Sequence, residues 1–164
     1  MAWQLDPYHS STAGVAVNSA MEEQAAFYIC QPEQLAHAGV KGLQSRDYHL
    51  DPAPSPDNKQ VQQIQLFFTD SASAKAGRAA IEGWHSNCTA GPSQKTASTP
   101  DGTAYLVTNG GTTHHEYFVQ RGAVIGSIVI TGYDAAAPSV KGTSQDKATL
   151  GAMASLLCAY NSAC

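Results

Sequence analysis

The sequence predicts an α+β domain in which helices pack on one face of an antiparallel meander sheet of about four to five strands. Three runs of β-branched and aromatic residues follow one another after residue 102, with glycine-containing turns between them. Two other stretches carry apolar residues at steps of three and four, which is the spacing of an amphipathic helix. The four cysteines add the expectation that disulfides staple the domain.

The composition excludes several classes of protein. Only 13% of the 164 residues are charged, 43% are hydrophobic, and the formal net charge is −4. So few basic side chains argue against a nucleic-acid partner, and the hydrophobic content argues against disorder. The apolar run at 123–130 is too short to cross a bilayer as a helix. We therefore expect a single domain over residues 19–164, preceded by an arm or a cloning remnant at residues 1–18.

The N-terminal half is predicted to contain one helix and one loop. Ser19 followed by Glu22 has the spacing of a capping box, so the stretch 20–29 is expected to be a helix. Residues 46–59 hold three prolines, which are disfavoured inside helices and central strands, and this segment is predicted to be a loop. Within it, Tyr48 and His49 are candidates for stacking on a ligand.

A strand and a helix are predicted between residues 60 and 88. Residues 60–69 are expected to form a strand because alternate positions divide between two faces. One face carries Gln62, Ile64, Leu66 and Phe68, and the other carries Gln63, Gln65 and Phe67. Asp70 and Ser71 then offer N-cap chemistry for a helix. Its apolar stripe consists of Ala74, Gly77, Ile81, Trp84 and Cys88.

The C-terminal half is predicted to be a meander followed by a helix. Residues 89–102 are interrupted by glycine and proline and are expected to be a loop. The three strands of the meander are 103–109, 112–120 and 123–131, with two-residue turns at Gly110-Gly111 and Arg121-Gly122. After a loop at 132–142, Thr143 or Ser144 caps a final helix. The residues that share one face of this helix are Leu150, Met153, Leu157 and Tyr160.

Pairing the meander strands through these turns brings polar side chains to one face. It places Glu116 between Tyr105 and Ser127, with His114 beside this row. The candidate ligand-binding residues are Tyr105, His114, Glu116 and Ser127, together with Tyr48 and His49. The opposite face is expected to be the helix-covered core, and it carries Ala104, Leu106, His115, Tyr117, Val119, Val124, Ile128 and Ile130.

The cysteines indicate the compartment. Cys30, Cys88, Cys158 and Cys164 make an even number, which favours an oxidising environment over the cytosol. Four cysteines allow three pairings, and their positions in the sequence do not choose among them. Residues 1–19 lack a basic n-region and a continuous apolar stretch. We therefore expect a protein of the cell surface or the extracellular space whose leader or anchor is absent from this chain.

A cysteine lies shortly before a proline-rich loop, and the strand VQQIQLFF leads into an alanine-rich helix that ends in WHSNC. This order of features resembles the PknH-like extracellular sensor domains, the ectodomains of actinobacterial serine/threonine kinases and related lipoproteins. The resemblance covers residues 30–88 best and extends loosely to Tyr160. It implies an α+β domain outside the membrane with a ligand cleft. It also implies two disulfides, one between the first and second cysteines, which are Cys30 and Cys88 here, and one between the third and the fourth. The family's second pair lies farther apart and earlier in the chain than Cys158 and Cys164.

Together these observations predict a non-enzymatic extracytoplasmic domain that binds a ligand or senses the cell envelope. Its partner would be a small molecule or an envelope component, with a membrane-anchored protein as a further partner. We expect neither a cofactor nor a metal, because His85 and Cys88 have zinc-binding spacing but lack a second pair.

Two alternatives remain open at this point. One is a secreted hydrolase that uses His114, Glu116 and Ser127, although Ser127 lacks the GxSxG elbow that exposes a serine beside oxyanion donors. The other is a protein–protein interaction module of the cell envelope, which would expose a contiguous apolar patch rather than an enclosed pocket.

Overall fold

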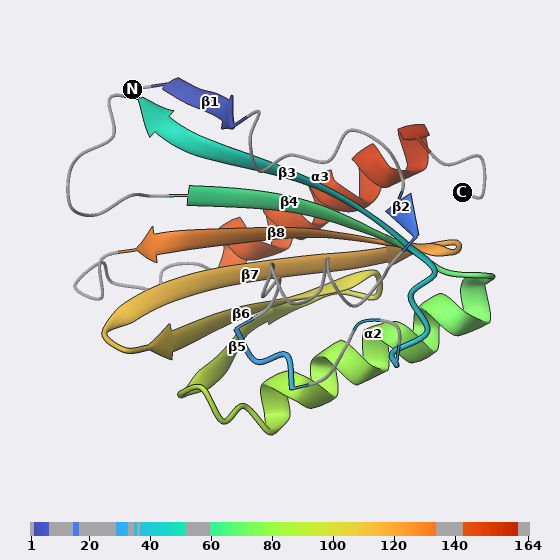
Figure 1. Cartoon of the computed structure of the whole chain (residues 1–164), viewed down its shortest axis with the longest axis horizontal. Coiled ribbons are helices and arrows are strands. Elements are labelled where there is room, and N and C mark those ends of the chain that lie inside the picture. The colour runs from blue at the N-terminus through green and yellow to red at the C-terminus, as the bar shows by residue number, and fades with distance from the viewer. Residues whose placement is uncertain are drawn as a thin grey trace.

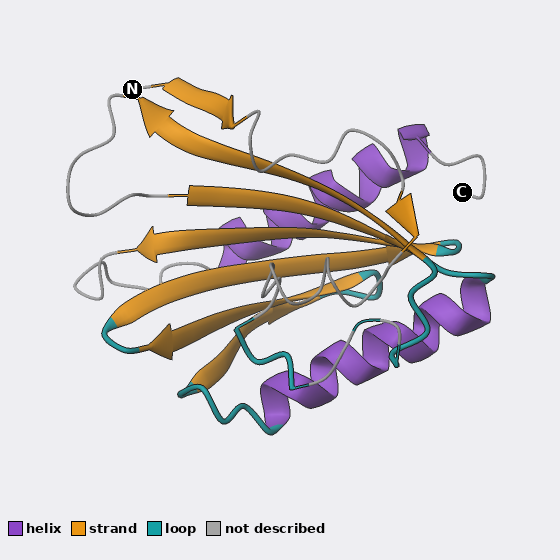
Figure 2. Cartoon of the chain, viewed as in Figure 1, coloured by secondary structure: helices purple, strands orange, loops and turns teal. Residues whose placement is uncertain are grey.

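The computed structural model consists of one eight-stranded sheet with a long helix on each side (Figure 1, Figure 2). It describes residues 2–6, 15–16, 29–32, 35, 37–51, 60–133 and 143–160. The strand order is β1-β3-β4-β8-β7-β6-β5, with β2 paired to β3, and these pairings are antiparallel. The predicted fold class, α+β with an antiparallel sheet and a disulfide, is confirmed.

The strands are β1 (Ala2–Asp6), β2 (Val15–Ala16), β3 (Gly42–Asp51), β4 (Gln60–Phe67), β5 (Ser93–Ser98), β6 (Gly102–Asn109), β7 (Thr112–Arg121) and β8 (Val124–Tyr133). The helices are α2 (Ser71–Ser86) and α3 (Thr143–Tyr160). The predicted helix at 20–29 lies, apart from Ile29, outside the described residues. In the part of the chain that the structure describes, neither helix is long and apolar enough to span a membrane.

Two segments predicted to be loops contain strands, so the sheet is larger than expected. β3 occupies the first part of the 46–59 segment and ends before its first proline, Pro52. β5 lies inside the 89–102 segment, between Pro92 and Pro100. In both cases the prolines flank a strand instead of interrupting it, which is the placement that their missing N–H allows.

The two helices cover opposite faces of the sheet, which corrects the prediction that both pack on one face. α2 buries Ala74, Gly77, Ile81 and Trp84 of its predicted stripe, while the fifth member, Cys88, lies beyond the end of the helix and is partly buried. On what we call the α2 face, the helix packs with Ile64, Leu66, Tyr105, Phe118 and Ile125. α3 buries Leu150, Met153 and Leu157 against Ala104, Tyr117, Val119 and Val124 on the α3 face. The physical reason is visible in β7, where every residue from Thr113 to Val119 is buried. A strand buried on both faces requires a cover on each side.

The turn between β7 and β8 shifts the predicted register by two residues. The β6–β7 turn at Gly110-Gly111 is confirmed, with both glycines at positive φ. The β7–β8 turn consists of Gly122 and Ala123 instead of Arg121 and Gly122. Gly122 has a φ of 53°. A two-residue turn with one glycine places that glycine first, where positive φ is needed, and this sets the register.

Cys30 and Cys88 form a disulfide with Cα atoms 4.8 Å apart, as the family resemblance implies. The bridge connects the segment before β3 to the residues just after α2. Cys158 lies in α3, and Cys164 lies outside the described residues, so their pairing with each other stays a prediction.

Gly77 marks a close contact between α2 and the sheet. A Cβ atom at this position would overlap the ring of Phe68. Replacing Gly77 with alanine is therefore expected to lower the free energy of unfolding by about 1–3 kcal/mol, as overpacking of cores does. Gly83→Ala is the matched control in the same helix, because nothing lies within 4 Å of its Cβ position. It should raise stability by up to about 1 kcal/mol. Urea unfolding of both variants tests the contact, and equal effects would contradict it.

Candidate functional site

The polar row predicted on the meander lies in the interior. Glu116 lies opposite Tyr105, as predicted, but Ser127 lies opposite Phe118. Tyr105, Glu116, Ser127 and His114 are all buried. Because α2 packs over this face, a ligand would reach Tyr105 and Glu116 only after α2 had moved. The row therefore forms no open surface, and ligand binding by these residues stays a prediction.

A histidine–glutamate pair joins α2 to β7 within this interior. His85 Nε2 lies 3.4 Å from Glu116 Oε2, and both side chains are 0% exposed. His85 Nδ1 lies 3.0 Å from Ser93 Oγ, and the imidazole stacks on Tyr105 with ring centroids 3.8 Å apart. The backbone N–H of Ile29 donates to Glu116 Oε1 at 3.1 Å. The pair thus holds α2, β7 and the segment at residue 29 together.

Burial shifts the pKa values of this pair toward their neutral forms. It raises the pKa of Glu116 to about 7, against the lowering effect of the Ile29 hydrogen bond. It lowers the pKa of His85 to about 4, while Glu82 raises that pKa and Lys95 lowers it. Between about pH 4 and pH 7 both shifts favour a protonated Glu116 facing a neutral His85.

A second histidine–carboxylate pair holds α3 to the other face of β7. His115 Nε2 lies 3.4 Å from Asp146 Oδ2, in the first turn of α3. Tyr117 Oη donates to Asp146 Oδ1 at 2.9 Å and lies 3.0 Å from His115 Nδ1. Burial lowers the pKa of His115, and Asp146 opposes that shift. Both pairs therefore connect a helix to β7. Within the described ranges, no group of three or more His, Cys, Asp and Glu side chains is placed to hold a metal ion.

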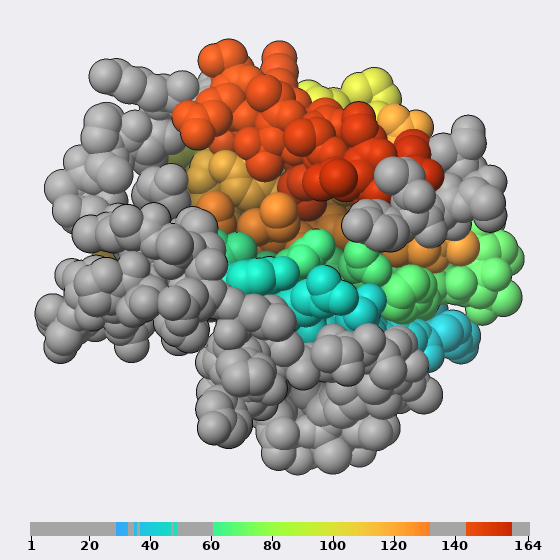
Figure 3. Space-filling view, turned by 90° about the horizontal axis from the view of Figure 1, so that it is seen from above, coloured from blue at the N-terminus to red at the C-terminus, as the bar shows by residue number. Residues whose placement is uncertain are grey.

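A groove runs along the α3 face beside α3. Figure 3 shows α3 (red) next to a strip of sheet surface formed by β8, β4 and β3 (orange, green and cyan). Two adjoining pockets of about 350 Å³ and about 250 Å³ lie here and share Arg46, Gln63 and Gln65. The residues that define this α3 groove are Gln44, Arg46, Gln63, Gln65, Gly126, Ile128, Met153, Leu156 and Leu157. The larger pocket falls within the range of roughly 300–1,000 Å³ that is typical of small-molecule sites.

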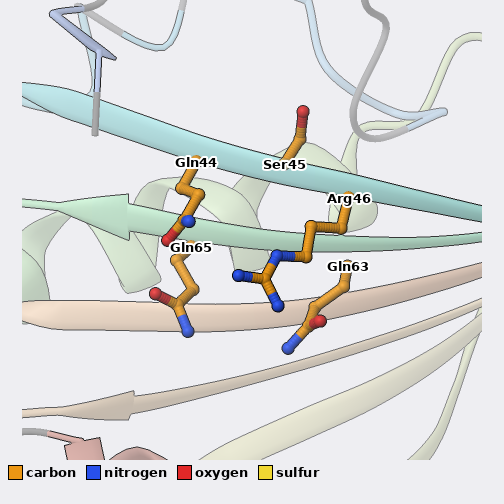
Figure 4. A pocket seen from close by; sticks show the side chains of 5 residues that line it. All are labelled: Gln44, Ser45, Arg46, Gln63 and Gln65. Atoms are coloured by element: carbon orange, nitrogen blue, oxygen red, sulfur yellow. The ribbon is translucent and has the colours of Figure 1, made fainter. Parts of the chain in front are cut away.

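Polar side chains from two neighbouring strands line one side of the groove. Gln44 lies opposite Gln65, and Arg46 lies opposite Gln63, in the β3–β4 pairing. Figure 4 shows the guanidinium of Arg46 between the amides of Gln63 and Gln65, while Ser45 points away from them. The alternation of strand side chains explains this arrangement, because Ser45 and Ile64 face the core on the α2 side.

Arg46 is an exposed cation, and no carboxylate among the described residues pairs with it. By contrast, Arg78 pairs with Glu82 at 3.2 Å and Arg121 pairs with Asp101 at 2.6 Å. A guanidinium offers five N–H donors in a fixed fork that matches carboxylates and phosphates. The described residues of the groove therefore present one positive charge beside amides that both donate and accept hydrogen bonds.

Of the predicted binding residues, Tyr48 adjoins the groove. It lies in β3, two residues after Arg46, and its Oη donates to Gln63 Oε1 at 3.4 Å. His49 is paired through its backbone with Gln60, and its side chain lies outside the described residues. His114 stays on the α2 side, with Nδ1 3.3 Å from Thr131 Oγ1, and burial lowers its pKa.

The sequence places two of the groove's polar side chains on one face of a strand, but it does not identify them as site residues. The alternation in residues 60–69 places Gln63 and Gln65 on the face opposite the core residues of that strand, and this is confirmed. Arg46 is missed because the prolines of the 46–59 segment predict a loop there, and Gln44 is missed because no element is predicted for residues 40–45. In the structure, buried Leu43 and Ser45 alternate with more exposed neighbours in a strand that begins at residue 42. Because Ser45 is polar, this alternation is not visible in the sequence.

No protein-family model matches this chain, and no curated protein matches it. Among solved structures, the extracellular domain of PknH from Mycobacterium tuberculosis is similar, with a TM-score of 0.49 and 16% sequence identity. The alignment covers 81% of this chain and 73% of that chain. This is a distant structural similarity, and it assigns neither a family nor a function to the present chain.

Proposed function

We propose that this chain is a non-enzymatic, extracytoplasmic ligand-binding or sensor domain whose ligand occupies the α3 groove. The observation that carries the proposal is an open pocket of about 350 Å³ in which Arg46 has no carboxylate partner among the described residues. Charged residues are only 13% of this chain, so a cation placed among three glutamines is a specific feature of the surface.

The compartment and the absence of catalysis rest on separate arguments. The Cys30–Cys88 bridge supports a location outside the cytoplasm, because disulfides form and persist in oxidising compartments. The groups best suited to acid–base chemistry, Glu116 of β7 and His85 of α2, are fully buried between the helix and the sheet. A substrate in the α3 groove lies across the sheet from them, so we assign that pair to the attachment of α2 and the groove to binding.

Nuclear magnetic resonance tests whether the groove binds a ligand. We expect D-glucose, D-glucuronate, D-glucose-6-phosphate or N-acetyl-L-alanine, added singly to the isotope-labelled protein, to shift resonances in proton–nitrogen spectra. The shifts should concentrate on the side-chain amides of Gln44, Gln63 and Gln65, since these groups line the larger pocket. A panel in which no probe shifts any groove resonance would contradict the proposal.

A matched pair of variants ties the shifts to the groove. Gln65→Trp places an indole in the space between β4 and α3, and it should abolish the shifts while the melting temperature stays close to that of the wild type. Gln94→Trp introduces the same side chain at an exposed position of β5 that lines neither pocket, and it should leave the shifts unchanged. Loss of binding in both variants would count against the groove as the site.

A further inference from the structure

We infer that the ligand of the α3 groove is a sugar acid, meaning a hydroxyl-bearing ring with one carboxylate; this inference rests on the proposed function. Three parts of the groove carry it: the row of amides, the guanidinium of Arg46 and the apolar wall. Each part matches one chemical feature of such a ligand.

The amides match hydroxyl groups. Each glutamine side chain has a carbonyl acceptor and an NH₂ donor, and a hydroxyl group likewise donates and accepts. Directly opposed residues of antiparallel strands have Cβ atoms about 5 Å apart, and residues two apart on one strand lie about 7 Å apart. The rectangle formed by Gln44, Gln65, Gln63 and Arg46 therefore has the dimensions of a single sugar ring. Tyr48 Oη donates to Gln63 Oε1, which orients that amide.

The guanidinium matches one carboxylate. Arg46 lies at one corner of this rectangle and has no carboxylate partner among the described residues, so its fork of donors is available to a ligand. Guanidinium and carboxylate groups form two parallel charge-assisted hydrogen bonds, which are roughly twice as strong as neutral ones. Among the described residues that line the larger pocket there is one cation, which fits a ligand with one negative charge better than a polyanion.

The apolar wall matches the C–H face of a sugar ring. Met153, Leu156 and Leu157 of α3 face the polar side of the groove, and Leu156 is 61% exposed. An exposed leucine beside amides suits a ligand that is polar around its edge and apolar on its faces. An extended peptide is a poorer match, because peptides that bind by main-chain hydrogen bonds add to a sheet edge, whereas this groove lies on a sheet face.

Titrations of the wild-type protein with D-glucuronate, D-glucose and D-glucose-6-phosphate test the inference. We expect glucuronate to bind at least tenfold more tightly than glucose, because only glucuronate uses the two hydrogen bonds of Arg46. A tenfold ratio corresponds to about 1.4 kcal/mol, which lies at the lower end of what hydrogen bonds to charged groups contribute. Preferential binding of the phosphate ester would overturn the carboxylate assignment.

Variants of Arg46 separate charge from geometry. Arg46→Gln should weaken the binding of glucuronate about tenfold and change the binding of glucose little. The affinity of Arg46→Lys for glucuronate should lie between those of Arg46→Gln and the wild type, since lysine keeps the charge and loses the fork of donors. Lys75→Gln removes an exposed cation on α2 and should change neither affinity. If glucose binds as tightly as glucuronate, or if Arg46→Gln has no effect, the inference is wrong while ligand binding in the groove stands. If none of the sugars binds, and N-acetyl-L-alanine does not bind either, both proposals fail.

Discussion

Replacing Cys30 and Cys88 together with alanine is expected to lower the free energy of unfolding by about 4 kcal/mol. The bridge closes a loop with a sequence separation of 58, and a cross-link of that length removes much of the conformational freedom of the unfolded chain. Domains of this size are stable by roughly 5–15 kcal/mol in total, so the loss would be a large fraction of the whole. The measurement is urea unfolding at fixed pH, with the midpoint and the slope analysed together.

The slope distinguishes loss of the cross-link from loss of packing. Without the bridge the unfolded chain expands and exposes more surface, so the m-value of the double variant should rise. Val40→Ala is the packing control, because Val40 is buried in the same core cluster as Cys30 and takes no part in a bridge. It should lower the midpoint with an unchanged m-value. A double variant that loses less than about 1 kcal/mol at constant slope would show that the bridge contributes little.

The parts of this fold that depend on local pattern could be predicted from the sequence. The stripe of α2 is predicted correctly because Asp70 caps the helix, accepting from the Ser73 N–H at 2.7 Å, and because the buried residues recur at helical spacing. The hairpin at Gly110-Gly111 follows from the preference of two-residue turns for positive φ. In both cases a few neighbouring residues fix the structure.

The parts that depend on distant contacts could not be predicted. Nothing near Glu116 in the sequence reveals His85, its partner on α2, which lies 31 positions earlier. A polar side chain in a strand is usually a sign of an exposed face, and only a partner from elsewhere in the chain allows it to be buried. The same limitation left undecided whether the polar row of the meander is covered. It also left the α3 groove unrecognised, since Gln44 and Gln63 meet only through the β3–β4 pairing.

The His85–Glu116 pair has a second large expected effect, which is the pH dependence of stability. Burial on folding raises the pKa of Glu116 from 4.5 to about 7. Between pH 4.5 and pH 7 the folded state therefore binds more protons than the unfolded state. Glu116 therefore makes stability fall as the pH rises through this window. His85 has the opposite sign, because its pKa falls from 6.5 to about 4 and the unfolded state binds the extra proton. Its contribution rises with pH between about 4 and 6.5.

In the wild type the two slopes cancel over most of the shared window, because folding moves one proton from His85 to Glu116 without net uptake. Single variants should reveal each slope, which reaches about 1.4 kcal/mol per pH unit for one proton. Relative to the wild type, Glu116→Gln should gain stability from pH 4.5 to 7, in total on the order of 3 kcal/mol. His85→Gln should lose a similar amount between pH 4 and 6.5.

Urea unfolding of the three proteins at half-unit pH steps measures these differences, and the comparison with wild type removes the contributions of the other titrating groups. The test also decides which protonation state the core holds. A buried ion pair of charged Glu116 and charged His85 would lower the first pKa and raise the second, which would reverse both signs. In that case Glu116→Gln would show no relative gain between pH 5 and 7. Between pH 4.5 and 6.5, a relative gain with pH in Glu116→Gln together with a relative loss in His85→Gln is expected only if burial keeps both side chains neutral. Desolvation penalises the charged form of each group.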